Sequence, residues 1–347
     1  MCPAPEKGIL LAALGSPETP TLRAVRRYLR RFLMDGFVLD LPLPLRALLV
    51  NLLIVPFRAP KTLRSYKTIW TSEGPPLTAT VKRLAEKLEK RTGLPVTVGM
   101  RYSAPTLRDA VLQLASRNVT EILLVPLYPH YALATYESTV RAARCARDRF
   151  SPGTPLLALK PFYSDSAYIE ALAGLLAPFL EEPFDHLLFT YHSVPLRHLK
   201  KADPTGEHCL RKPDCCNTPS PAHLTCYKVH VLTTTKLLAQ RLDLAPEKYS
   251  ISFQSKFGPG AWLEPATEEC FLQLPSKGVR NLVVTAPSFT SDCLETLEQI
   301  KLRGREAFLS AGGRRFLYAP CLNDHRLWVE AIAGWIEKGK DSLFAPL

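Results

Sequence analysis

Short apolar segments alternate with longer segments of helical periodicity along most of the 347 residues. The apolar runs predict eight strands, at residues 8–16, 95–103, 121–129, 155–163, 186–194, 249–256, 280–289 and 314–322. Between them, apolar residues recur at helical spacing in residues 76–93, 106–118, 166–180 and 230–242. Buried strands that alternate with helices are typical of parallel sheets with helices on both faces. The fold class is therefore predicted to be α/β, with doubly wound sheets.

The two halves of the chain resemble each other. GILLAALGSP is similar to HLLFTYHSVP, and EILLVPLYPHYA is similar to NLVVTAPSFTSD; each is an apolar strand followed by a polar loop with proline. The length also favours more than one domain. We expect two Rossmann-like lobes, residues 1–160 and 161–347, with a cleft between them. Ligands of such sheets bind beyond the carboxyl ends of the strands, so the chemistry is expected in those loops.

Composition and charge exclude several classes of protein. The chain is 46% hydrophobic and 22% charged, which is typical of a folded protein. It contains neither GxGxxG nor GxxxxGK[ST], so a nucleotide enzyme of either type is not expected. The net charge of +12 is spread over several segments without a nucleic-acid motif, and a basic rim around a carboxylated ligand explains it equally well. MCPAPEKGIL does not have the pattern of a signal peptide, which predicts a cytoplasmic protein.

Two residues that follow predicted strands are candidates for chemistry. His192 follows the run LLFTY, where a neutral imidazole can accept a proton or bind a metal, or can be an ordinary loop residue. Glu295 lies three residues after Asp292, a spacing that also fits a helix capping box. Alternatively, its carboxylate faces His192 across the cleft, and the two residues come from equivalent strand ends of the two lobes, where they would form a metal or proton-transfer pair. Arg101, Tyr102, Tyr131 and Trp262 also follow strands, where they suit either the core or a flat ligand with charged edges.

Several stretches in order resemble the signature stretches of the ferrochelatase family. They are ILLAALGSPETP, YKTIWTSEGPPL, VGMRYSAPTL, LYPHYA, FTYHSVP, SFQSKFGPGAWLEP and APSFTSDCLETLEQ, and the similarity runs from about residue 8 to residue 336. The resemblance implies a lyase that inserts Fe²⁺ into a porphyrin, protoporphyrin IX, to form haem, with the release of two protons. A cobalt-inserting tetrapyrrole chelatase and a porphyrin-binding protein without turnover are the alternatives.

The resemblance also implies roles for individual residues. His192 and Glu295 would be the pair that handles protons and the substrate iron, while Arg101, Tyr102, Tyr131 and Trp262 would line the macrocycle. Residues 41–57 fall in the pocket lip of the family, so they would either contact a membrane peripherally or form a buried helix. Two positions depart from the family pattern: Cys293 stands where histidine is usual, and Gln299 where an acidic residue is frequent.

Four of the nine cysteines lie close together, within an insert at about 203–228. In a reducing cytoplasm the thiols of Cys209, Cys215, Cys216 and Cys226 favour metal ligation over disulfides. Four thiolates suit Zn²⁺ or a [2Fe–2S] cluster, and no CxxC pair is present to favour a zinc ribbon. The resemblance to bacterial ferrochelatases with an internal insert favours the cluster, with His208 and His223 as alternative ligands.

Overall fold

The computed structural model describes residues 7–339 and 343–347. These residues divide into two compact units. The first comprises the described residues up to Tyr128, Leu133–Pro161 and the described residues from Asn323 onward, and the second Pro129–Ala132 and Phe162–Leu322. The units are therefore discontinuous, unlike the predicted ranges 1–160 and 161–347, because the end of the chain returns to the first unit.

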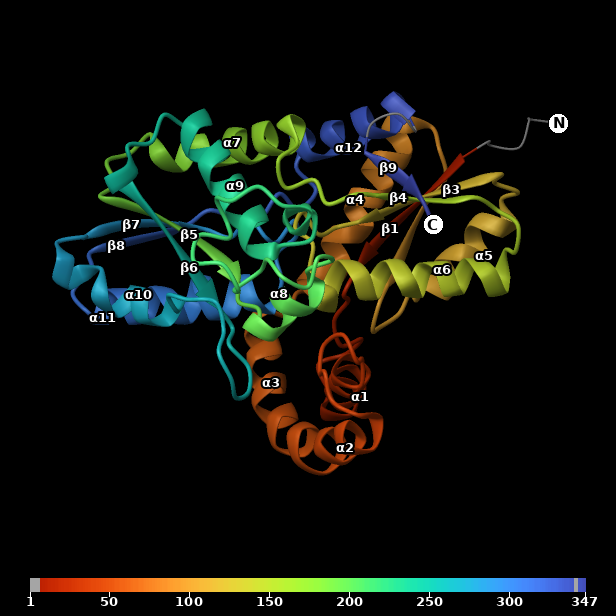
Figure 1. Ribbon diagram of the computed structural model, residues 1–347, viewed down its shortest axis with the longest axis horizontal. Coiled ribbons are helices and arrows are strands. Elements are labelled where there is room, and N and C mark those ends of the chain that lie inside the picture. Colours follow the sequence, from red (N-terminus) through yellow and green to blue (C-terminus); the bar gives the residue numbers. More distant parts are fainter. Residues whose placement is uncertain (1–6, 340–342) are drawn as a thin grey trace. The chain divides into compact units, whose positions relative to one another are not determined.

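The first unit is built on a five-stranded sheet in the order β2-β1-β3-β4-β9. Its strands are β1 (Lys7–Ala13), β2 (Val96–Met100), β3 (Glu121–Pro126), β4 (Leu156–Leu159) and β9 (Phe344–Pro346). All pairings are parallel except β4 with β9. The sheet lies between the pair α5 (Leu107–Ser116) and α6 (Ser138–Phe150) and the pair α4 (Pro76–Thr92) and α12 (Arg326–Lys338) (Figure 1). The buried strand residues pack against apolar residues of α5 and α6 on one face, and α4 and α12 supply buried apolar residues on the other (Figure 1).

A helical arm belongs to the same unit (Figure 1). It consists of α1 (Leu22–Leu33), α2 (Leu43–Leu48), the π-helix η1 (Leu49–Ile54) and α3 (Val55–Ile69), while a second π-helix, η2 (Leu133–Glu137), precedes α6. Helix α1 begins where Thr21 caps it by accepting a hydrogen bond from the amide of Ala24. The arm carries a row of exposed leucines, described below.

The second unit contains a fully parallel sheet in the order β6-β5-β7-β8. The strands are β5 (His186–His192), β6 (Tyr249–Gln254), β7 (Asn281–Thr285) and β8 (Arg315–Tyr318). One face is covered by α7 (Ser166–Leu180) and α9 (Tyr227–Arg241), the other by α10 (Thr267–Gln273) and α11 (Arg305–Ser310) (Figure 1). The remaining elements are α8 (Leu196–Ala202), the short 3₁₀ turns η3 (Pro221–Leu224), η4 (Pro246–Lys248) and η5 (Pro275–Lys277), and the π-helix η6 (Glu295–Gly304).

The parallel strands of the two sheets follow the same spatial order. In each sheet the second strand in sequence lies outside the first, and the third and fourth continue on the other side. The stretches that resemble each other in sequence form β1 and β5 in one case and β3 and β7 in the other. These strands occupy equivalent positions in the two sheets, so the similarity in sequence corresponds to a similarity in topology. In such an order the chain switches direction between the first and third strands, and ligands are bound at the carboxyl ends there. In the second unit this place lies between β5 and β7.

Candidate functional site

His192 is the last residue of β5, at the carboxyl edge of the second sheet. Its ring nitrogen Nδ1 lies 2.7 Å from the carbonyl oxygen of Ser193. Because a carbonyl can only accept, Nδ1 must carry a proton, and in the neutral ring the lone pair then lies on Nε2. The main chain thus selects, for the neutral ring, the tautomer in which Nε2 can take a proton or bind a metal ion.

Glu295 follows the neighbouring strand β7 and begins the π-helix η6. Strands β5 and β7 pair in parallel, so His192 ends one strand and Glu295 follows the adjacent strand of the same sheet, ten residues after its last residue, Thr285. Both belong to the second unit, and the expectation that each lobe supplies one of them is wrong. The cap position of η6 is Leu294, which forms no side-chain cap.

The carboxylate of Asp292 accepts hydrogen bonds from two side-chain hydroxyl groups. Its Oδ1 accepts hydrogen bonds from Tyr318, at 2.6 Å, and from Thr296, at 2.9 Å. Cys293 and Cys321 are buried beside this group, and burial raises the pKa of both thiols, as do neighbouring carboxylates. The carboxylate that acts on Cys293 is that of Glu295. A neutral thiol thus stands beside Glu295, where the family usually has histidine.

Gln299, the second departure from the family pattern, has a defined partner. Its Oε1 accepts a hydrogen bond from Ser255 at 2.5 Å, and the neighbouring Glu298 forms an ion pair with Arg303 at 3.0 Å. A π-helix is a rare conformation that is frequent at functional sites, and η6 carries Glu295, Glu298 and Gln299 within its first turn.

Trp262 and Tyr131 lie in loops of the second unit. Trp262 is bridged to Pro195, three residues after His192, and its indole N–H has no hydrogen-bond partner among the described residues. The amide of Tyr131 donates to Nδ1 of His230 at 3.1 Å, and burial lowers the pKa of His230 to about 4. Both side chains are half-buried, which suits contact with a ligand.

Arg101 and Tyr102 belong to the first unit and share an acceptor that the sequence did not reveal. Oδ2 of Asp35 accepts from Arg101 at 2.6 Å, from Tyr102 at 2.9 Å and from Ser138 at 2.5 Å. Burial would raise the pKa of Asp35, but the bonds from Ser138 and the Phe37 amide, together with the charge of Arg101, lower it. Tyr102 is only 2% exposed, so its ring is part of the core.

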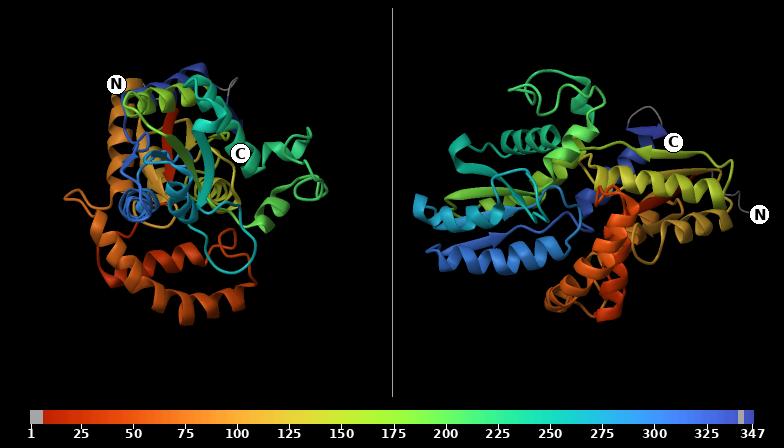
Figure 2. Two further views of the ribbon diagram at one scale, coloured as in Figure 1. Left: turned by 90° about the vertical axis from the view of Figure 1, so that its left-hand side faces the viewer. Right: turned by 60° about the horizontal axis from the view of Figure 1, so that its bottom comes forward.

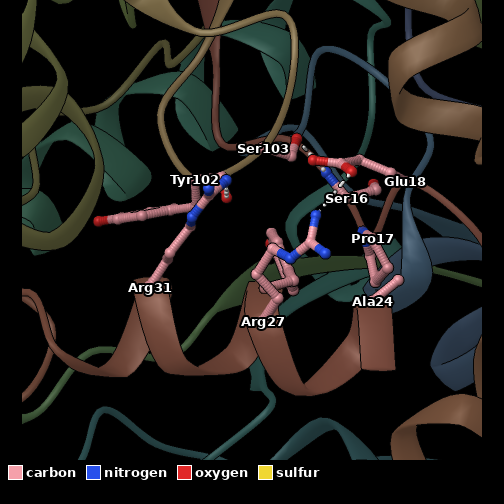
Figure 3. A pocket seen from close by; sticks show the side chains of 9 residues that line it. Ser16, Pro17, Glu18, Ala24, Arg27, Arg31, Tyr102 and Ser103 are labelled. Carbon is pink, nitrogen blue, oxygen red and sulfur yellow. Dashed lines mark hydrogen bonds and ion pairs between the residues drawn. The ribbon is translucent and has the colours of Figure 1, made fainter. Parts of the chain in front are cut away.

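A small pocket lies beside this network in the first unit (Figure 3). Arg27 and Arg31 extend from α1 along one side, and Ser16 and Ser103 form the other. Arg27 is paired with Glu18 at 3.2 Å, and Arg31 donates to the carbonyl of Tyr102 at 3.5 Å. The space suffices for about one water molecule, which excludes a macrocycle from this pocket itself.

The four clustered cysteines lie in a loop that stands out from the second unit (Figure 2). Cys209, Cys215 and Cys226 are buried, with 4%, 9% and 4% of their surface exposed. Burial, and then the neighbouring Cys226, raises the pKa of Cys209 to about 12, and burial raises that of Cys216 to about 11. Cys209 interacts electrostatically with Cys226 and Cys215, and so does Cys216, so the four thiols are neighbours. Among the described residues, no three His, Cys, Asp or Glu side chains form a group that could hold a metal ion.

Hydrogen bonds to the main chain hold this loop. Nε2 of His208 and Nε2 of His223 both lie within 2.7–2.8 Å of the carbonyl oxygen of Cys215. Oδ2 of Asp203 accepts from the amides of His208 and Cys209 at 2.9 and 2.8 Å. Thiolates are the ligands that soft metal centres prefer, but the four thiols, although neighbours, do not form a group that could hold a metal ion among the described residues.

The helical arm has an exposed apolar side. Leu43, Leu45, Leu48, Leu52, Leu53 and Phe57 are all exposed, with Leu52 at 62% and Phe57 at 78%. The continuous helical segment Leu43–Ile69 is long and apolar enough to cross a membrane by length and composition only. These residues therefore do not form the buried helix that was one of the two alternatives for 41–57.

Comparison with known proteins agrees with these features. The family model described as Ferrochelatase matches residues 6–340. A ferrochelatase of Opitutus terrae is 42% identical over 95% of this chain and 96% of its own length, and one of Ectopseudomonas mendocina is 43% identical over 97% and 99%. Among solved structures, the sirohydrochlorin chelatase SirB of Bacillus subtilis in complex with cobalt has a TM-score of 0.56 at 10% identity, over 98% of this chain and 99% of that one. The two-lobed α/β chelatase fold predicted from the sequence is confirmed.

Proposed function

Because the chain belongs to the ferrochelatase family, we propose that it inserts ferrous iron into a porphyrin to form haem. The observation that carries this proposal is the identity to ferrochelatases over nearly the whole length of both chains. The arrangement of His192 supports it, since the main chain leaves Nε2 free at the edge of the sheet where ligands bind. Protoporphyrin IX is the porphyrin we propose, and the reaction releases its two pyrrole protons.

His192 and Glu295 supply the two kinds of group that this reaction needs. Inserting a divalent ion requires the pyrrole nitrogens to lose protons while the ion sheds its waters. The free Nε2 of His192 is a neutral base or ligand, and the Glu295 carboxylate is an anionic one. We propose that these two residues divide proton removal and iron delivery between them, at adjacent strand ends of one sheet.

We propose that Arg101, Tyr102, Tyr131 and Trp262 form the porphyrin site. The unpaired indole N–H and half-buried ring of Trp262 support direct contact, as does the half-buried ring of Tyr131. Arg101, whose side chain is 26% exposed, can offer its outer edge to a carboxylate while Asp35 holds its Nη2. The hydroxyl of Tyr102 is bonded to Asp35, so Tyr102 would contribute to the shape of the porphyrin site and would not form a hydrogen bond with the porphyrin.

An anaerobic titration tests the activity. The purified protein is incubated with protoporphyrin IX or coproporphyrin and with Fe²⁺ or Co²⁺, and the metalloporphyrin is followed by its absorption. Faster turnover of protoporphyrin with Fe²⁺ is the expected result. Preference for Co²⁺ would identify a cobalt chelatase, and saturable porphyrin binding without product would identify a binding protein.

We propose that Cys209, Cys215, Cys216 and Cys226 bind a [2Fe–2S] cluster, as in bacterial ferrochelatases with an internal insert. The four mutually close thiols support this assignment. When bound, such a centre would order a loop that has little apolar core, and metal insertion itself requires no electron. Visible absorption with iron and sulfide analysis of protein purified without air tests it. Two irons and two sulfides per chain are expected. Bound zinc would support the four-thiol site with a different metal. If the protein contains neither a cluster nor zinc, the segment is an ordinary loop.

We further propose a cytoplasmic protein that contacts the membrane peripherally through residues 41–57. The exposed leucines of the helical arm support this, because an apolar face of this kind is suited to the boundary between headgroups and acyl chains. The protein is expected to float together with anionic lipid vesicles in a density gradient. The double variant L52S/F57S is expected to lose this co-flotation. Resistance of the membrane-bound protein to alkaline carbonate extraction would indicate a spanning segment instead.

A further inference from the structure

The peptide groups on both sides of the His192 side chain are held by hydrogen bonds. Its amide donates to Oγ of Ser288 at 3.2 Å, and its carbonyl accepts from the hydroxyl of Tyr227 at 2.9 Å. The Tyr227 hydroxyl also forms a hydrogen bond with Ser288. Together with the bond from Nδ1 to Ser193, these contacts engage every polar group of His192 except Nε2.

Tyr227 is itself fixed in place. It is 6% exposed, and its ring packs edge-on against that of His130 with 5.7 Å between centroids. Nε2 of His130 is hydrogen-bonded to Thr234 at 3.0 Å, on the same helix α9 that carries Tyr227. The hydroxyl of Tyr227 can therefore move relative to His192 only if the beginning of α9 moves.

The beginning of α9 depends on the cysteine loop. Tyr227 is the first residue of the helix and directly follows Cys226, which occupies the cap position without a side-chain cap. Cys226 is buried against Cys209 and Ala222. No capping side chain fixes this helix end, so the packing of the loop determines its position.

A second chain of bonds runs from the same loop. His223 is bonded through Nε2 to the carbonyl of Cys215, and its own carbonyl accepts from Nε2 of His230 at 2.9 Å. Nδ1 of His230 accepts from the amide of Tyr131, as described above. The loop is thus linked to the main chain at His192 and at Tyr131.

We infer that Tyr227 is a positioning residue for His192, and that the cysteine loop controls the reaction by setting where α9 begins. The inference rests on the proposed function and extends it, because it gives the loop an effect on the reaction without electron transfer. An ordered loop holds the Tyr227 hydroxyl against His192, and Nε2 is then aimed correctly. A disordered loop releases it, and a small displacement of a reacting group lowers the rate strongly.

The first test compares Tyr227→Phe with Tyr191→Phe. Tyr191 is a buried tyrosine of the same strand as His192, and its hydroxyl bonds to Thr235 of α9 at 2.7 Å without touching the His192 peptide groups. We expect Tyr227→Phe to lower kcat about tenfold or more with KM for the porphyrin changed less than twofold. Tyr191→Phe should keep kcat within about twofold of wild type. Unchanged kcat in Tyr227→Phe, or equal losses in both variants, would overturn the inference.

Nuclear magnetic resonance of ¹⁵N-histidine separates this inference from the proposed function. The His192 ring should show the Nδ1–H tautomer in the wild type and averaged tautomer signals in Tyr227→Phe, whether or not the protein inserts iron. Wild-type ring signals in a folded Tyr227→Phe variant would overturn the positioning role. A wild type without chelatase activity but with this difference would instead overturn only the proposed function.

A double-mutant cycle tests the connection to the loop. Asp203→Asn keeps the side-chain volume and weakens the acceptor of the His208 and Cys209 amides, and Cys226→Ser changes the residue next to Tyr227. Each should lower kcat, and neither should lower it further when Tyr227→Phe is already present. Fully additive losses in both cycles would show that the loop and Tyr227 act independently.

Discussion

The carboxyl end of β5 and the cysteine loop belong to the same unit, and each carries groups proposed to meet a metal. At the end of β5, main-chain pairing with β6 and β7 and three further hydrogen bonds hold His192 in place. The loop has only the short turn η3, and bonds from a few side chains hold its main chain. The difference indicates that the sheet builds one site before its ligand arrives, whereas a ligand is needed to complete the other.

The largest effect is expected where the arrangement is complete without ligand. His192→Ala should lower the rate of iron insertion by about 100-fold or more, since a positioned acid or base contributes that much. The thermal midpoint should stay near that of the wild type, because the ring is half-exposed. Activity assays measure the rate of iron insertion, and thermal melts measure the midpoint of unfolding.

His186→Gln is the matched control, because His186 begins the same strand, at its other end, and its Nε2 bonds to Ser250 at 2.7 Å. Ordinary turnover in His192→Ala would contradict the assignment of the site.

Removing one thiol should act on stability before it acts on chemistry. Cys209→Ser is expected to lose the visible absorption and the metal of the proposed cluster, and to speed amide exchange of residues 203–226 while the strands remain protected. Cys145→Ser, which changes an exposed cysteine outside the loop, should do neither. Equal exchange in Cys209→Ser and wild type would mean that the loop is also complete without a ligand, and the contrast with β5 would disappear.

Substitutions of two aspartates, one in the packed first unit and one in the cysteine loop, should differ in their effect on global stability. Asp35 and Asp203 each accept several hydrogen bonds, the first within a packed unit and the second in the loop. Asp35→Asn should lower the free energy of unfolding by about 1–3 kcal/mol, measured by urea titration, because a buried charge-assisted bond is lost. Asp203→Asn should leave the global value nearly unchanged and speed exchange only in the loop. A global loss of similar size in both variants would contradict this distinction.

The smallest effect concerns pH. Burial lowers the pKa of His230 from 6.5 to about 4, so the unfolded chain binds more protons than the folded one between these values. Stability should therefore fall as the pH drops from about 6.5 toward 4. His230→Gln should reduce the slope of the urea midpoint between pH 7 and pH 5. Some slope should remain, since burial also lowers the pKa of His130; an unchanged slope would contradict the neutral state of His230.

Buried runs of β-branched and leucine residues were sufficient to predict all eight parallel strands. Strand β9 was not predicted, because three residues that include Pro346 carry no such pattern and pair only with the edge strand β4. His192 could be identified because it stands where an apolar run ends.

Asp35, Ser288 and Tyr227 could not be identified, since their partners are distant in the chain. Asp35 meets Arg101 after 66 residues, and Ser288 meets His192 after 96. The π-helix η6 likewise gave no local signal, because its residues also fit an ordinary helix.

The bond between Nδ1 of His192 and Ser193 has a consequence for the stoichiometry of a turnover. Each porphyrin gives up two protons, but an imidazole with one free nitrogen holds one at a time. The ring does not pass a proton through itself into the strand, because the partner of its Nδ1–H is a peptide carbonyl, which is too weak a base to take that proton. A proton taken at Nε2 must leave from Nε2. Either the ring is emptied between the two proton transfers or Glu295 takes the second, and rapid-mixing experiments should therefore resolve two proton releases in each cycle.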